Sequence, residues 1–159
     1  MIYRREIWNT PDDDIIAVDW SRPNPLIRAP IMVHIHGLEG SSNSHYARAL
    51  MARCGQGGVR GVVIHYRAAA VSPIKKLRAY NAADAAELDW EFARLRELYP
   101  EAPIYAMGVS LGANNLLFWP VPEARTLQNW FQASLQSARP SIWWVQATLS
   151  AKDSAGFTT

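Results

Sequence analysis

The chain has 159 residues, 49% apolar and 19% charged, which is enough for one domain with a buried core. A formal net charge of +2 at pH 7 is too small to indicate a nucleic-acid partner, and no window approaches about 18 uninterrupted apolar residues, so no membrane span is expected. The single cysteine, Cys54, excludes an intramolecular disulfide, and without an apolar signal region the expected location is cytoplasmic.

Short apolar runs, typical of buried strands, alternate along the chain with longer amphipathic segments, typical of helices. In chain order we expect a β-prone run at 14–20, a strand at 30–37, a helix at 41–58, a strand at 60–66, a helix at 81–100, and a strand at 103–110 that leads into a helix-prone run. This alternation predicts an α/β fold, with a mainly parallel sheet and helices on both faces. Functional sites in such sheets lie at the carboxyl ends of the strands.

The composition changes after about residue 119. Four of the seven tryptophans lie in 119–159, and acidic residues fall to two, Glu123 and Asp153. The segment 126–136 could form a short amphipathic helix, but no further strand–helix alternation is expected. We therefore divide the chain into residues 1–119 and residues 120–159.

Ser110 stands between Gly108 and Gly112 in the string GVSLG, directly after the last predicted strand. In a strand-to-helix turn, G-x-S-x-G is typical of a nucleophilic serine, because the turn lifts the hydroxyl clear of the sheet, near the positive end of the following helix. The two glycines avoid side chains that would collide where strand and helix cross. The alternative is a serine that only caps the helix.

The string HGLEGSS follows the strand at 30–37 and is a candidate oxyanion hole. A carbonyl attacked by serine develops an oxyanion, which needs two N–H donors. One is expected from the residue after the nucleophile, Leu111, and the other from just beyond the His36–Gly37 pair, at Leu38. Gly37 and Gly40 would let the backbone turn these N–H groups inward. The alternative is a tight turn without a chemical role.

The histidines allow a second interpretation, a metal site. His34 and His36 are two apart on one predicted strand, and His65 ends a neighbouring strand. Because no cysteine and no His-x-x-x-His pair lies nearby, core or turn histidines are favoured. We expect neither a metal nor a cofactor.

The strings HGLEGSSNSHYAR, GVVIHYR and APIYAMGVSLGANNLL resemble the YheT-type subfamily of α/β-hydrolases, over about residues 4 to 119. The resemblance implies a serine carboxylesterase that acts on a small-molecule substrate, a short- to medium-chain acyl ester or an acylglycerol. It makes Ser110 the nucleophile and Leu38 and Leu111 the oxyanion donors. The residues that support the turns are then His36, Gly37, Gly40, Gly108 and Gly112.

In this family the triad acid and histidine follow the serine along the chain, whereas all four histidines here precede Ser110. We therefore expect a partial α/β-hydrolase fold, truncated at both ends and lacking the later strands, with residues 120–159 as a frame-shifted, disordered or helical tail. Esterase activity would be weak or absent, and the alternative is a non-catalytic remnant or a binding and interaction module. The strand that ends at Ser110 would be an exposed sheet edge, which favours self-association.

Overall fold

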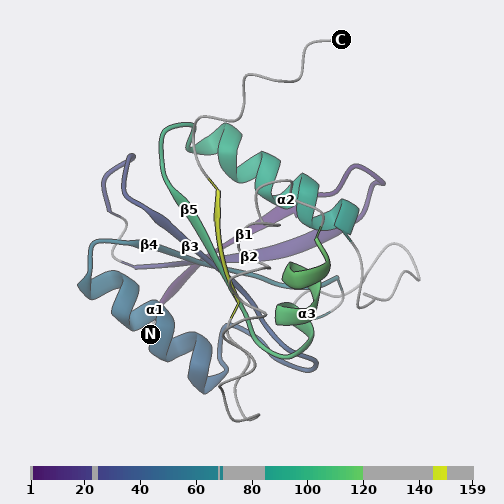
Figure 1. Cartoon of the computed structure of the whole chain (residues 1–159), viewed down its shortest axis with the longest axis horizontal. Helices are drawn as coiled ribbons and strands as arrows, with labels where there is room; N and C mark the ends of the chain where they lie inside the picture. Colours follow the sequence, from purple (N-terminus) through teal and green to yellow (C-terminus); the bar gives the residue numbers. More distant parts are fainter. Residues whose placement is uncertain (1, 23–24, 68, 70–84, 120–144, 150–159) are drawn as a thin grey trace.

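The structure is a computed structural model that describes residues 2–22, 25–67, 69, 85–119 and 145–149. A six-stranded sheet in the order β1-β2-β4-β3-β5-β6 lies at its centre, with helices packed against it (Figure 1). The strands are β1 (Tyr3–Asn9), β2 (Ile15–Ser21), β3 (Ile31–Ile35), β4 (Arg60–Ile64), β5 (Ile104–Gly108) and β6 (Val145–Leu149). The helices are α1 (His45–Gln56), α2 (Ala85–Leu98) and α3 (Leu111–Phe118).

The α/β class is confirmed, but only the centre of the sheet is parallel. Strand β3 pairs in parallel with both β4 and β5, whereas β1–β2, β2–β4 and β5–β6 are antiparallel. The prediction of a mainly parallel sheet therefore holds for β4, β3 and β5 and is corrected to a mixed sheet. The β1–β2 pair is antiparallel because a tight turn joins the two strands, in which Thr10 N–H donates to Asp14 O at 2.9 Å.

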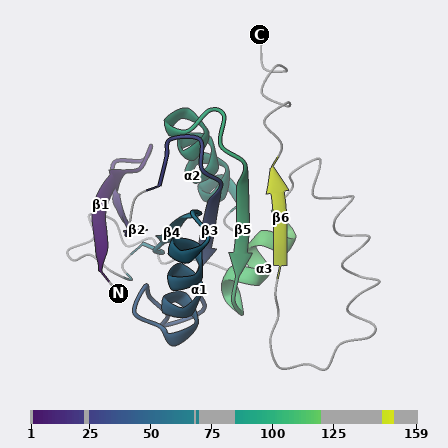
Figure 2. The ribbon, with the colours of Figure 1, turned by 90° about the vertical axis from the view of Figure 1, so that its left-hand side faces the viewer.

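Strand β5 is not a sheet edge, contrary to the expectation from the sequence. Strand β6 pairs with it along its whole length, and within the described residues the edge strands are β1 and β6 (Figure 2). At least one strand after Ser110 is thus present. The helix expected at 126–136 lies outside the described residues.

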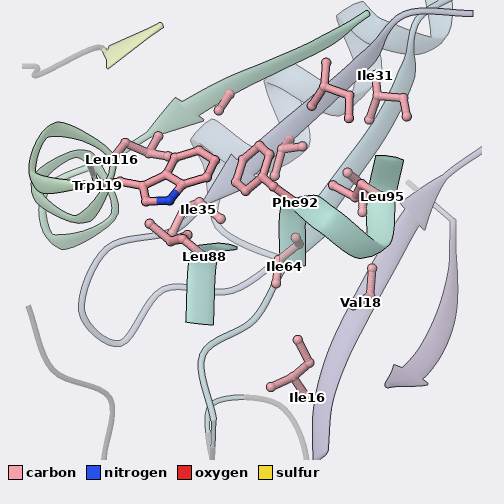
Figure 3. Packing of buried hydrophobic residues seen from close by; sticks show 14 of the residues in the cluster. Ile16, Val18, Ile31, Ile35, Ile64, Leu88, Phe92, Leu95, Leu116 and Trp119 are labelled. Atoms are coloured by element: carbon pink, nitrogen blue, oxygen red, sulfur yellow. The ribbon is translucent and has the colours of Figure 1, made fainter. Parts of the chain in front are cut away.

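Helices cover both faces of the sheet, as predicted. Helices α2 and α3 pack on one face through Leu88, Phe92 and Leu116, among others, and α1 packs on the opposite face (Figures 1 and 3). Successive residues of a strand alternate between the faces, so Val62 of β4 contributes to the first cluster and Val63 to the second.

Helix α1 begins at His45, with Ser44 at its N-cap, inside the segment 41–58 expected to be helical. The Ser44 hydroxyl accepts a hydrogen bond from Ser41 N–H at 3.0 Å, which closes a turn just before the helix. Cys54 is buried on the apolar side of α1, as expected. Crossing a bilayer would require a longer and more apolar helix than any in the described part of the chain.

Candidate active site

Ser110 occupies the turn between β5 and α3, in a backbone conformation that a residue other than glycine rarely adopts. Its φ is 52° and its ψ is −112°, a strained region that typically costs about 1–3 kcal/mol. Hydrogen bonds hold the turn: Val109 N–H donates to Ile35 O at 3.1 Å, and Gly112 N–H donates to Val109 O at 3.0 Å. Ser110 itself is exposed, so its hydroxyl can meet a substrate.

Gly108 and Gly112 allow strand and helix to cross at this turn. A Cβ atom on Gly112 would lie closer than 3.0 Å to backbone atoms of both Ile35 and His36, and one on Gly108 would collide with the backbone of Gly112. Real Cβ atoms essentially never approach backbone so closely, and backbone cannot move aside as a flexible side chain can. The close contact places the N-terminus of α3 against the carboxyl end of β3.

The loop after β3 lies directly beside the serine. A Cβ atom on Gly37 would be 3.1 Å from Val109 O and 3.3 Å from Ser110 Cβ, so Leu38, the next residue, is carried to the same place. Gly40 N–H donates to Gly37 O at 2.9 Å and closes a turn around Leu38. The two segments singled out in the sequence therefore meet in space.

The glycines of this loop act differently from the sequence expectation. The residue with positive φ is Glu39, at 56°, and neither Gly37 nor Gly40 has a positive φ. Gly40 is instead required for close packing, because a Cβ atom there would lie 2.5 Å from Tyr46 Oη and 2.9 Å from Gly37 O. The expectation is therefore corrected for the residue at which the loop turns, whereas the loop does lie beside Ser110.

An open hollow of about 600 Å³ lies over the turn. Its lining is mainly apolar, and its polar contributors are Ser110 and Asn114; the lining residues are Leu38, Ser110, Leu111, Ala113, Asn114 and Leu117. Within the described part of the chain, no hydrogen bond uses the backbone N–H of Leu38 or that of Leu111. Leu38 and Leu111, which line the hollow together with Ser110, thus keep backbone N–H groups that no described hydrogen bond uses.

His36 lies next to the site but does not hydrogen-bond to Ser110 as a general base would. Its ring is buried, Nδ1 lies 2.8 Å from Gly37 O, and the ring packs edge-on against Tyr66 with centroids 4.9 Å apart. Burial lowers the pKa of His36 to about 4, although the bond to Gly37 O opposes the shift. At pH 7 the ring is neutral and Nδ1 donates its proton to the carbonyl, which fixes the start of the loop.

The other histidines do not complete a triad. His34 faces α1, with Nδ1 3.2 Å from Met107 O and its ring against Tyr46, and His65 Nε2 contacts Asp19 at 2.9 Å. None of the described histidines hydrogen-bonds to Ser110. The described residues also contain no group of three or more His, Cys, Asp or Glu that could hold a metal ion.

Asp19 is a buried carboxylate that the sequence analysis missed. Arg5 contacts both of its oxygens at 2.7 Å, and Oδ2 also accepts from Ser42 Oγ at 2.6 Å. Burial opposes its ionisation, but the hydrogen bonds from Arg5, His65 and Ser42 outweigh burial and hold the pKa of Asp19 below its usual range. Ser42 and His65 both hydrogen-bond to this carboxylate and not to each other. Ser42, His65 and Asp19 therefore do not form a Ser–His–Asp relay, in which the serine would bind the histidine. The sequence feature that could have pointed to this buried carboxylate is the position of Asp19 inside the apolar run DIIAVDW.

No family model matches the chain, but known proteins are similar to it in sequence. The chain is 34% identical over 124 residues to YheT of Escherichia coli (strain K12), named as a candidate esterase, and the match covers 72% of this chain and 36% of that protein. It is 29% identical over 158 residues to the phospholipase ABHD3 of Mus musculus, which covers 89% of this chain and 38% of that protein. The chain thus spans about a third of the length of these relatives, and the second match extends beyond residue 119.

Solved structures agree on the architecture. The esterase Pf2001 of Pyrococcus furiosus matches with a TM-score of 0.58 at 20% identity, over 73% of this chain and 45% of that chain. At this level of identity the likeness concerns the fold alone.

Proposed function

Because this chain belongs to the α/β-hydrolase family, in the group that contains YheT, we propose that it is a serine carboxylester hydrolase with Ser110 as the nucleophile. The observation that carries the proposal is an exposed serine of positive φ in an apolar hollow, which is also lined by Leu38 and Leu111, two residues whose backbone N–H groups no described hydrogen bond uses. Strained backbone conformations of this kind cost stability and cluster at functional sites.

In the proposed reaction, Ser110 Oγ attacks the carbonyl carbon of the ester and gives up its proton to a general base. The carbonyl oxygen becomes an oxyanion, which the N–H groups of Leu38 and Leu111 stabilise. The C–O bond to the alcohol then breaks, the alcohol leaves with a proton, and an acyl-serine remains. Water hydrolyses the acyl-serine, releases the carboxylic acid and restores the hydroxyl. No described residue is assigned as the base.

The proposed substrates are short- to medium-chain acyl esters or acylglycerols. The apolar side chains of Leu38, Leu111 and Leu117 around the serine suit an acyl chain and offer no cation to a charged substrate. The names of the two relatives, an esterase and a phospholipase, both refer to ester hydrolysis. A cytoplasmic location remains a prediction, which cell fractionation would test.

Turnover of p-nitrophenyl esters from acetyl to decanoyl tests this proposal. We expect release of p-nitrophenol by the purified chain, its loss in Ser110→Ala and its retention in Ser21→Ala, which removes a hydroxyl that accepts a hydrogen bond from Gly61 N–H of β4. Removing triad members in other enzymes leaves about 10³–10⁴-fold catalysis over water, so slow turnover still counts in favour. Equal rates in the wild type and Ser110→Ala would contradict it.

The alternative is a non-catalytic binding module with the same hollow. It is favoured by one observation, that no described histidine hydrogen-bonds to Ser110. A folded chain that binds a fatty acid in the hollow but gives identical background hydrolysis with and without Ser110 would support this alternative.

A further inference from the structure

Residues 36–44, which we call the oxyanion loop, join β3 to α1 and are hydrogen-bonded at both ends. At the near end, Gly37 packs against Ser110, as described above. At the far end, the Ser42 hydroxyl donates to Asp19 Oδ2 at 2.6 Å, and Ser42 O accepts from Tyr3 Oη at 2.8 Å. Leu38 therefore lies in a short loop whose far end is attached to β1 and β2 through one residue.

The acceptor for Ser42 is itself fixed by several groups. Arg5, the cross-strand partner of Asp19 in the β1–β2 hairpin, binds both carboxylate oxygens, and His65 contacts Oδ2 at 2.9 Å. Asp19 and Ser42 are only 1% and 2% exposed, so water does not compete strongly for this bond. Hydrogen bonds to a carboxylate are shorter and about twice as strong as neutral ones.

Stability alone explains this arrangement poorly. The Arg5–Asp19 pair is only half buried, because the Arg5 side chain is 44% exposed. Exposed ion pairs typically contribute little to stability, and replacing fully buried pairs by apolar side chains is often neutral or stabilising, so the pair is weak evidence for a purely stabilising role. A fixed position of the oxyanion loop matters next to Ser110, because oxyanion donors must lie within about 2.7–3.1 Å of the developing charge. A displacement of about 1 Å can lower a rate by about 100-fold.

We propose that Asp19 and Ser42 are positioning residues, which hold the oxyanion loop so that the backbone N–H of Leu38 stays beside Ser110. Neither residue touches the substrate. The proposal rests on the proposed esterase function for its catalytic consequence, whereas the attachment of the loop can be measured without any turnover.

The experiment compares Ser42→Ala with the matched control Ser21→Ala by NMR hydrogen exchange. Ser21 is also a buried serine, 3% exposed; its hydroxyl accepts from Gly61 N–H of β4 at 3.1 Å and makes no hydrogen bond to residues 36–44. The reporter of the loop is Gly40 N–H, which is bonded to Gly37 O. We expect Ser42→Ala to raise exchange at Gly40 by about tenfold or more and to leave Gly61 unchanged, and we expect the reverse for Ser21→Ala.

Turnover provides the second readout. Loss of oxyanion alignment should lower kcat of Ser42→Ala by about 10–100-fold with KM within about twofold, because the interaction exists mainly in the transition state. Ser42→Thr, which keeps the hydroxyl, should recover part of kcat. Ser21→Ala should retain the wild-type kcat.

Unchanged exchange at Gly40 in Ser42→Ala would overturn the proposal, and so would a rise spread evenly over the whole sheet, which would indicate loss of global stability only. With local exchange raised, an unchanged kcat in an active chain would also overturn it. If the wild type shows no turnover, the esterase proposal fails, and the exchange data alone decide whether Ser42 holds the loop.

Discussion

Replacing Gly112 by alanine should destabilise the chain, although alanine is the better helix former. Gly112 is the second residue of α3, and its Cβ atom would collide with the carbonyl of Ile35 and with His36 O. Because backbone lies on both sides of the contact, the N-terminus of α3 must move away from β3 or the strand end must shift. Either movement displaces the Ser110 turn.

The expected magnitude follows from two opposing effects. Overpacking against a well-packed site costs about 1–3 kcal/mol, and a clash with backbone belongs at the upper end. The helix propensity of alanine over glycine returns at most about 1 kcal/mol. The net loss for Gly112→Ala is therefore about 2 kcal/mol in the free energy of unfolding, which corresponds to a Tm lower by about 4–8 °C for a chain of this size.

Gly57→Ala is the matched control, since a Cβ atom there meets Arg53 O at an ordinary 3.4 Å. Urea and thermal unfolding should give a free energy close to wild type for Gly57→Ala and the predicted loss for Gly112→Ala. If the two variants unfold alike, Gly112 is not required for the crossing of β5 and α3. Retained esterase turnover in Gly112→Ala would likewise contradict the link between this contact and the serine turn.

Three further predictions concern other parts of the chain. Burial lowers the pKa of both His34 and His36 to about 4, so the unfolded chain binds more protons than the folded chain between about pH 6.5 and 4. The free energy of unfolding should therefore decrease as the pH is lowered through that window, by at most about 1.4 kcal/mol per pH unit for each histidine. A free energy of unfolding in urea that does not change with pH would be inconsistent with neutral buried rings. The pKa of Asp19 is held low in the folded state, so its carboxylate stabilises the fold above about pH 4, and this stabilisation is lost in more acidic solution. The difference in the free energy of unfolding between wild type and Asp19→Asn should therefore shrink from pH 7 to pH 3. A difference that stays constant would refute the low pKa of Asp19. Strand β1 is an edge strand with Ile7 45% exposed, so sedimentation should detect concentration-dependent association that Ile7→Lys reduces; a monodisperse wild-type monomer would argue against it.

The parts of the fold that were predictable from sequence are those with local signals. The apolar runs of β3, β4 and β5 and the 4-3 spacing of Leu88, Phe92 and Leu95 in α2 each indicate their element without knowledge of the rest. Strand β1 was missed because only Trp8 in it is buried, and its hairpin with β2 stabilises it. Strand β6 was missed because it exists through pairing with β5, far away in the sequence.

The candidate site divides in the same way. The string GVSLG predicts the turn of Ser110, and HGLEG places Leu38 near it, because both motifs encode local geometry. The contacts of Asp19 were not predictable, since Ser42 is 23 residues away and His65 is 46 residues away. Only the folded sheet brings these residues together.

Covalent labelling of Ser110 by a fluorophosphonate probe tests the central claim most directly. The probe loses fluoride and forms a bond to an activated serine oxygen, so labelling reports nucleophilicity without requiring turnover. The account predicts one added probe, mapped by mass spectrometry to Ser110, absent in Ser110→Ala and kept in Ser21→Ala. A folded wild-type chain that stays unlabelled, or a label that persists in Ser110→Ala, would contradict it.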